Sequence, residues 1–106
     1  ILAAGHRLTQ SAQVVAITLG EKGAFVITKN EAWHCSAPLV QVKSDVGAGD
    51  SFLGGFLTAL ERGEDLINCS RWAIAAATAS VMQEGTARCD LRDVKRLLKV
   101  ITITKC

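Results

Sequence analysis

The stretch DVGAGDSFLGG, residues 45–55, joins a Gly-Ala-Gly turn to one carboxylate and then opens an apolar run. Glycines such as Gly47 and Gly49 accept positive φ and let another molecule approach the main chain closely. Several N–H groups can then converge on one point, which attracts an anion. The apolar residues that follow have helical spacing, so the unpaired N–H groups and the dipole of a helix start add to the same point. The stretch predicts an anion cradle formed by Gly47, Ala48 and Gly49.

Asp50 needs a separate explanation, because its charge would repel the anion that the cradle is built to hold. One interpretation is that Asp50 caps the helix, a position at which Asp is favoured. The other is general base catalysis, in which the carboxylate takes the proton of an alcohol whose oxygen attacks a phosphoryl group. The residues alone leave both interpretations open. No GK[ST] follows the glycines, so a Walker A nucleotide site is excluded.

Three strands are expected upstream of this stretch and three helices from it onward. VVAITLG, at 14–20, is a β-branched apolar run typical of a strand buried on both faces, and 23–29 and 32–37 follow it across turn signals. The helices are expected at about 50–62, 66–83 and 90–99, with Gly63 just past the first, Gly85 stopping the second and Asp90 capping the third. The pattern of the tail, 100–106, fits a strand or a fraying helix.

The order of these elements leaves two fold classes open. Strands first and helices afterwards indicate an α+β fold, but a piece of a larger α/β sheet would show the same order. A length of 106 residues suits one compact unit, so residues 1–106 are expected to form a single domain. The sequence starts without Met and as though already inside a helix, which suggests a fragment of a longer protein.

The composition argues against several classes of protein. Apolar residues make up 49% and charged residues 21%, which is typical of a globular protein. The net charge is only +2, and two Trp, three Phe and no Tyr supply little aromatic surface, so a nucleic-acid partner is not expected. The four Cys have no metal-ligand spacing and are expected to be free thiols. No apolar run approaches the ~20 residues that span a bilayer, so we expect no membrane contact and a cytoplasmic location.

DVGAGDSFLGGF resembles the second signature of the ribokinase-like sugar kinases, the PfkB carbohydrate kinase family, whose pattern is approximately D-T-x-G-A-G-D-x-F. VVAITLGEKGAFVI is similar to the T-x-G-x-x-G segment of that family, and AAATASVMQEGT continues the similarity downstream. VKSDVGAGDS and QEGTARC look most like the phosphofructokinase branch. The resemblance implies the C-terminal part of a ribokinase-like three-layer α/β/α fold, cut from a kinase that transfers the γ-phosphoryl group of ATP, with Mg²⁺, to a hydroxyl of a sugar or sugar phosphate.

The same resemblance implies roles for individual residues. Asp50 would be the catalytic base, and the backbone amides of Gly47, Ala48 and Gly49 would form the anion hole. The residues that would contact the nucleotide are Thr18, Gly20 and Gly23 beside its phosphates, Ile74, Ala77 and Thr78 on one wall of the base site, and Val42, Lys43 and Ser44 on the other.

Structural explanations stand beside these roles. Thr18, Gly20 and Gly23 could form only a hairpin turn, and a stripe of alanines is more often plain helix packing. Gly54 and Gly55 each cost a helix about 1 kcal/mol relative to Ala, which close approach to a strand or a ligand would explain. The lone histidines, His6 and His34, are expected to be structural or exposed.

Parts of the family pattern have no counterpart in this sequence. The first signature, the sugar-binding N-terminal sheet and the acidic segment that helps organise Mg²⁺ are missing, and Val46 stands where the signature has Thr. We therefore expect the isolated chain to be weakly active or inactive, with no metal ligands of its own. The second hypothesis is a non-catalytic module that binds nucleotide or associates into a homodimer through an exposed sheet edge.

Overall fold

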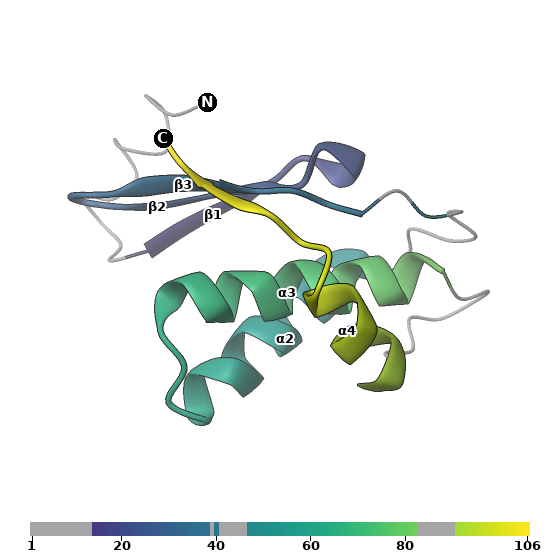
Figure 1. Cartoon of the computed structure of the whole chain (residues 1–106). Coiled ribbons are helices and arrows are strands. Elements are labelled where there is room, and N and C mark those ends of the chain that lie inside the picture. Colours follow the sequence, from purple (N-terminus) through teal and green to yellow (C-terminus); the bar gives the residue numbers. More distant parts are fainter. Residues whose placement is uncertain (1–13, 39, 41–46, 83–90) are drawn as a thin grey trace.

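The computed structural model describes residues 14–38, 40, 47–82 and 91–106. In this part of the chain a four-stranded sheet lies against a layer of helices, as Figure 1 shows. The elements follow one another as β1 (Val14–Thr18), the 3-10 turn η1 (Gly20–Lys22), β2 (Ala24–Thr28), β3 (Ala32–Cys35), α2 (Ala48–Glu61), α3 (Leu66–Val81), α4 (Leu91–Leu98) and β4 (Ile103–Lys105). The expected strands and helices are all present, and the undecided tail contains a strand.

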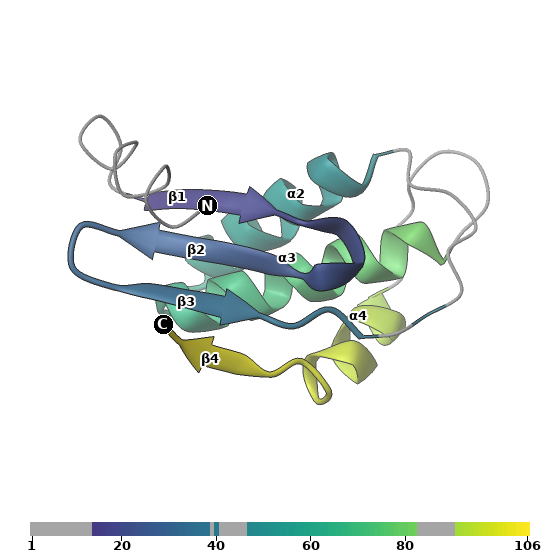
Figure 2. The ribbon, with the colours of Figure 1, turned by 90° about the horizontal axis from the view of Figure 1, so that it is seen from above.

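The sheet is antiparallel throughout and has the order β1-β2-β3-β4 (Figure 2). Val14 pairs with Thr28 and Thr18 with Ala24, so the first two strands form an antiparallel hairpin. The last strand returns to β3 after all three helices, with Cys35 opposite Ile103. The helices cover one face of the sheet, so the described residues supply the sheet and one helical layer.

The prediction that the first strand is buried on both faces is wrong. β1 lies at the end of the strand order, Ala16 and Thr18 are exposed, and its other residues are half-buried. The strand also ends at Thr18 and not at residue 20, because Gly20 takes a positive φ of 60° and starts a 3-10 turn. An apolar β-branched run marks a strand, but it does not distinguish a central position from one at the edge.

The helix ends differ in several places from the predicted ones. α2 begins at Ala48, two residues earlier than expected, and it ends before Gly63, which has a φ of 82° as predicted for a residue just past a helix. α3 begins after Asp65, whose side chain accepts a hydrogen bond from the Asn68 N–H at 2.8 Å. Residues 1–12, Gly85 and Asp90, for which a helix end, a helix stop and a cap are expected, lie outside the described residues.

α2 and α3 pack against each other at a glycine. A Cβ added to Gly55 would lie 2.8 Å from both the Ala76 Cβ and the Trp72 carbonyl oxygen. The close approach expected for this glycine is therefore real, but its neighbour is helix α3 and not a strand or a ligand. The alanine stripe of α3 serves the same packing, since Ala73 and Ala76 are buried on this side.

Polar contacts fix α3 to the sheet. The indole N–H of Trp33 in β3 donates to the Ser70 Oγ at 3.4 Å, and that hydroxyl donates to the Leu66 carbonyl at 2.7 Å. Around this link the core contains Ala24, Val26, Trp33, Cys35, Phe52, Ala73, Ile74, Ala75, Ala76, Ala79, Val94, Leu97 and Ile101. Among the described helices, none combines the length and the apolar character that crossing a bilayer requires.

Candidate functional site

The turn between β1 and β2 forms one border of the site. The Leu19 N–H donates to the Gly23 carbonyl at 2.7 Å, and the Gly23 N–H donates to the Gly20 carbonyl at 3.0 Å. His34 supports the turn from β3, because its Nε2 lies 2.6 Å from the Lys22 carbonyl oxygen, to which it donates. His34 is thus structural, as the sequence predicted.

Gly23 and Gly20 have positive φ for different reasons. At Gly23, with φ 87°, a Cβ would lie only 1.9 Å from the carbonyl oxygen of Cys35, so the turn is pressed against the end of β3. At Gly20, with φ 60°, a Cβ would meet no atom within 4 Å. The space beside Gly20 is open to a ligand, whereas Gly23 is required by the fold.

The start of α2 forms the second border. Gly47 is the N-cap, in the left-handed conformation with φ 83°, and Ala48, Gly49 and Asp50 make up the first turn. The first intrahelical bond runs from the Ser51 N–H to the Gly47 carbonyl at 2.9 Å. The N–H groups before it have no partner within the helix, and they point out of its positive end.

The position of the N-cap of α2 tests the interpretation in which Asp50 caps the helix. The N-cap is Gly47, so the prediction that Asp50 caps the helix is wrong. The Asp50 side chain is exposed at the third helical position. Asp is favoured at an N-cap, which made capping one of the two interpretations, but the left-handed residue that starts this helix is three positions earlier.

One pocket joins the two borders. Its volume is about 400 Å³, and it lies between one end of the sheet, the start of α2 and the last turns of α3. Because the strands are antiparallel, the end of β1, the start of β2 and the end of β3 lie at the same end of the sheet, beside the α2 N-terminus (Figure 2). The residues that line it are Thr18, Gly20, Gly23, Ala37, Pro38, Val40, Ala48, Gly49, Phe52, Ile74, Ala77, Thr78 and Val81.

Most of the residues singled out from the sequence meet in this pocket. Thr18, Gly20 and Gly23 come from the β1–β2 turn, Ala48 and Gly49 from α2, and Ile74, Ala77 and Thr78 from α3. Gly47 and Asp50 belong to the same helix start but do not line the pocket. Val42, Lys43 and Ser44 lie outside the described residues.

Other lining residues were not expected. Ala37, Pro38 and Val40 lie in the segment that follows β3, to which the sequence analysis assigned no role in the site. Phe52 and Val81 lie within the expected helices at 50–62 and 66–83 but were not singled out as site residues. The one sequence signal for Phe52 is its place in the GAGDSF run, because an apolar residue at helical spacing looks the same whether it faces the core or a ligand.

The chemistry of the pocket favours a ligand with an apolar part and an anionic part. Ile74, Ala77 and Val81 give it an apolar wall, and none of the described lining residues is charged. The hydroxyls of Thr18 and Thr78 and the N–H groups of the α2 start are the polar groups available to an anion. Within the described ranges, no group of three His, Cys, Asp or Glu side chains could hold a metal ion.

The chain is similar to known proteins over most of its length. The model of the pfkB family carbohydrate kinases matches residues 1–93. The chain is 36% identical over 101 residues to the ATP-dependent 6-phosphofructokinase isozyme 2 of Mycobacterium tuberculosis, covering 93% of this chain and 30% of that protein. It is 34% identical over 101 residues to the 1-phosphofructokinase of Borreliella burgdorferi, covering 93% of this chain and 32% of the relative.

A solved structure of a kinase is similar to this chain in fold as well. The phosphofructokinase-2 of Escherichia coli, crystallised with substrates and products, superposes with a TM-score of 0.85 at 27% identity, over 92% of this chain and 32% of that one. The sheet and helices described above are therefore those of a ribokinase-like kinase. The chain spans about a third of the length of the relatives that it matches.

Proposed function

The chain belongs to the pfkB family of carbohydrate kinases, and from that premise we propose that it is the nucleotide-binding portion of an ATP-dependent kinase. The acceptor is a hydroxyl of a sugar or sugar phosphate. The observation that carries this proposal is the pocket of about 400 Å³ beside the start of α2. It brings together Thr18, Gly49 and Thr78, which come from β1, α2 and α3. The phosphofructokinases among the relatives favour a fructose-phosphate-like acceptor.

The residues present fit a nucleotide. The apolar wall of α3, with Ile74 and Ala77, suits a flat heterocyclic base, and the helix start suits phosphates. A Cβ added to Gly49 or Gly20 would meet no protein atom within 4 Å, so the main chain is open to close approach at both positions. ATP would supply the phosphoryl group that is transferred.

Asp50 acts as the general base in this proposal. Its exposed carboxylate lies in the first turn of α2, next to the N–H groups of Ala48 and Gly49. The carboxylate takes the proton of the acceptor hydroxyl while that oxygen forms its bond to phosphorus. The N–H groups donate to the phosphoryl oxygens, on which negative charge is spread in the transition state.

Magnesium enters the proposal only as the counter-ion of the nucleotide phosphates. The described residues offer no set of three metal-ligating side chains, and Asp50 is the one carboxylate at this helix start. No step is assigned to a metal held by this chain. We expect the 106 residues alone to transfer phosphate slowly or not at all.

A second candidate function is a nucleotide-binding module without catalysis. The observation that favours it is that the pocket is lined by Thr18, Gly49 and Thr78 but not by Asp50, the candidate base. This module would bind Mg-ATP and show no transfer even when combined with the rest of a kinase fold. Activity therefore separates the two functions, whereas nucleotide binding is common to both.

The test is calorimetric titration of the chain with Mg-ATP, together with the variants Asp50→Asn and Gly49→Val. We expect Asp50→Asn to bind within about threefold of the parent affinity, because Asp50 does not line the pocket. Gly49→Val should abolish binding, since its side chain fills the phosphate end while meeting nothing in the fold. Gly63→Ala, at the opposite end of α2, is the matched control and should leave binding unchanged.

The catalytic part of the proposal is tested in the enzyme of Mycobacterium tuberculosis with its 101 matched residues exchanged for those of this chain. There, Asp50→Asn should lower kcat by about 10²–10⁴-fold, the range for loss of a general base, with little change in ATP affinity. Retention of kcat by Asp50→Asn would eliminate Asp50 as the base. Equal ATP affinity in the Gly49→Val variant would show that the pocket is not the nucleotide site.

A further inference from the structure

The side chain of His34 lies on the face of the sheet that is turned away from the helices. Its neighbours in β3, Trp33 and Cys35, are buried in the core on the helical side, where Trp33 bonds to Ser70 of α3. Successive side chains of a strand point to opposite faces of the sheet. The His34 ring is therefore on the other face, where it is tilted against Phe25 of β2 with the ring centroids 5.1 Å apart.

The turn η1 lies on that same face, at the end of the β1–β2 hairpin (Figure 1). Within the turn, the Lys22 N–H donates to the Leu19 carbonyl at 3.2 Å and the Gly23 N–H donates to the Gly20 carbonyl at 3.0 Å. The bond from outside comes from His34, whose Nε2 lies 2.6 Å from the Lys22 carbonyl oxygen. A carbonyl oxygen can only accept, so Nε2 carries the hydrogen of this bond.

Two neighbouring residues of β3 hold the end of this turn. His34 binds the Lys22 carbonyl through its side chain, and the main-chain carbonyl of Cys35 lies against Gly23, where a Cβ would come within 1.9 Å. Gly20 belongs to the same single turn of 3-10 helix, two residues before Lys22. The position of Gly20 therefore depends on β3 as well as on the hairpin that contains it.

Gly20 is the residue of η1 that lines the pocket. It lies there beside Thr18, the last residue of β1, and a Cβ on Gly20 would meet no atom within 4 Å. A main-chain N–H binds a phosphate oxygen only at a donor–acceptor distance of about 3 Å and with good alignment, and the bond weakens steeply beyond these limits. A small displacement of the turn is therefore enough to lose such a contact.

We propose that His34 is a positioning residue for the phosphates of the nucleotide. Its hydrogen bond to Lys22 holds η1 so that the main chain at Gly20 faces the start of α2 across the pocket. His34 does not line the pocket and touches no ligand itself. The inference rests on the proposed function, because it takes the ligand beside Gly20 to be the phosphate chain of a nucleotide. The base, against Ile74 and Ala77 of α3, does not depend on His34.

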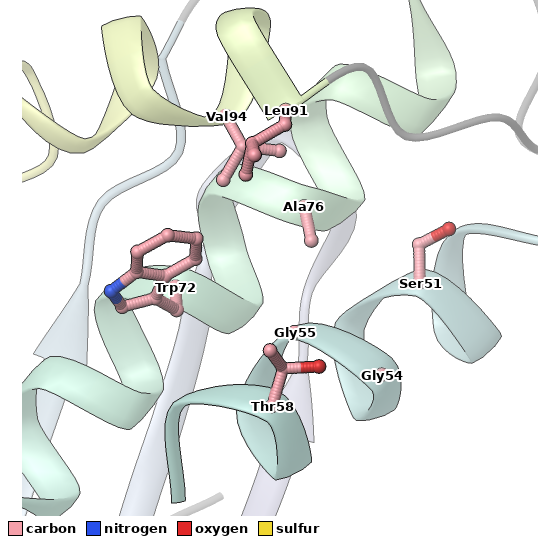
Figure 3. Close-up of a pocket in the computed structure, with 8 residues that line it drawn as sticks. All are labelled: Ser51, Gly54, Gly55, Thr58, Trp72, Ala76, Leu91 and Val94. Atoms are coloured by element: carbon pink, nitrogen blue, oxygen red, sulfur yellow. The ribbon is translucent and has the colours of Figure 1, made fainter. Parts of the chain in front are cut away.

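A second hollow on α2 has no contact with the turn. Its volume is about 280 Å³, and Figure 3 shows Ser51 and Thr58 of α2 on one side of it, with Trp72, Leu91 and Val94 across from them. None of the described residues that line it belongs to η1 or β3. A nucleotide bound in this hollow would be insensitive to His34, so variants of His34 distinguish the two locations.

The test is titration of the 106-residue chain with Mg-ATP and with adenosine, which has no phosphates, followed by NMR. His34→Phe keeps an aromatic ring against Phe25 and removes the donor, so its Kd for Mg-ATP should rise about tenfold. Its Kd for adenosine should stay within about twofold of the parent value, which a merely structural role would not predict. His34→Gln keeps an N–H donor and should restore Mg-ATP affinity to within about threefold of the parent.

Thr28→Val is the matched control. The Glu31 N–H donates to the Thr28 Oγ1 at 3.1 Å, so this variant also removes a bond between a side chain and the backbone of a turn, but at the opposite end of β2. It should leave both affinities unchanged. An unchanged Mg-ATP affinity in His34→Phe, or equal losses for Mg-ATP and adenosine, would overturn the inference.

Amide hydrogen exchange tests the role of His34 without a nucleotide. If the parent chain binds neither Mg-ATP nor adenosine, the proposed nucleotide site fails, but the N–H groups of Leu19 and Gly23 still report on the turn within which they are bonded. In His34→Phe they should exchange about tenfold faster relative to Val26 in β2, a ratio that corrects for any change in global stability. An unchanged ratio would show that His34 does not hold η1 and would overturn the inference, whatever the chain binds.

Discussion

At the scale of single residues, the two glycines of the β1–β2 turn should respond very differently to the same substitution. Gly23→Ala brings a Cβ within 1.9 Å of the Cys35 carbonyl oxygen, at a φ of 87° that L-residues rarely adopt. Strain and overpacking together should lower the free energy of unfolding by about 3–5 kcal/mol. Gly20→Ala should lower the free energy of unfolding by only about 1 kcal/mol, the cost of the left-handed conformation for an L-residue.

Urea denaturation followed by circular dichroism measures both free energies. Equal losses in the two variants would contradict the assignment of Gly23 to the fold. A Gly20→Ala variant that loses Mg-ATP affinity while remaining folded would locate the ligand beside Gly20, because its methyl group points into open space.

The sequence could predict that both glycines belong to a turn, but not which of them is sterically required. That difference depends on the carbonyl oxygen of Cys35, which β3 brings beneath the turn only after the hairpin and the third strand have paired. The helical spacing of the apolar residues after Asp50 placed it correctly at a helix start. It did not reveal that Gly47 is the N-cap, because a left-handed N-cap is set by the chain entering the helix.

At the scale of elements, the start of α3 depends on one side chain. The Asp65 carboxylate accepts a hydrogen bond from the Asn68 N–H at 2.8 Å, in the usual N-cap conformation. Asp65→Ala should lower the free energy of unfolding by about 1 kcal/mol. The neighbouring Glu64 only accepts a side-chain bond from Asn68 at an exposed position, so Glu64→Ala should cost less than about 0.5 kcal/mol.

Chemical denaturation of the two variants in parallel gives the comparison. A cost for Glu64→Ala as large as that for Asp65→Ala would mean that general charge at this turn, and not the cap, supports α3.

Helical periodicity predicted the middle of each helix better than its ends. The apolar spacing within 50–62 and 66–83 correctly indicated the helices α2 and α3, but Leu53, Leu57 and Leu60 of α2 are exposed, and the buried residues of α3 lie around most of its circumference. The strand predicted at 14–20 is present as β1, but the expectation that both its faces are buried was wrong. Its β-branched residues suit a half-buried edge as well as a centre, and the neighbours that decide between them are distant in sequence.

At the scale of the whole molecule, alkaline pH should weaken the contact between the sheet and α3. Cys35 is fully buried between them, and this burial raises the pKa of its thiol from 9.0 to about 11, opposed by the positive charge of Arg71. Between pH 9 and 11 the unfolded chain loses a proton that the folded chain keeps, so stability falls as pH rises. Below pH 9 both states keep the proton and the stability is fully present.

The expected loss is about 2–3 kcal/mol on going from pH 8.5 to pH 11. Cys35→Val removes the thiol and should flatten this part of the profile, and the difference between the two proteins isolates it from the titration of lysines. Unfolding by urea at a series of pH values provides the measurement. Parallel profiles for the two proteins would show that Cys35 does not carry the dependence.

The grouping of Thr18, Gly49, Ile74 and Thr78 in the pocket was predictable from the family resemblance, whereas the contribution of the segment after β3 was not. Thr18, Gly49 and Thr78 share no local pattern, so composition and periodicity could not have brought them together. Ala37 and Val40 line the pocket because they lie on the path of the chain that leaves β3. That path is a property of how sheet and helices dock, which no single segment encodes.

The position of the pocket between the sheet and the helices also bears on the order in which the chain folds. β1 with β2 and α2 with α3 are hairpins, closed by short loops whose formation costs little chain entropy. The residues that would hold the nucleotide are divided between these two units, Thr18 and Gly20 in one and Gly49 and Thr78 in the other. Contacts of such long sequence separation form late, so the site exists only once the two hairpins have docked. The appearance of binding competence during refolding therefore marks the completion of the tertiary structure.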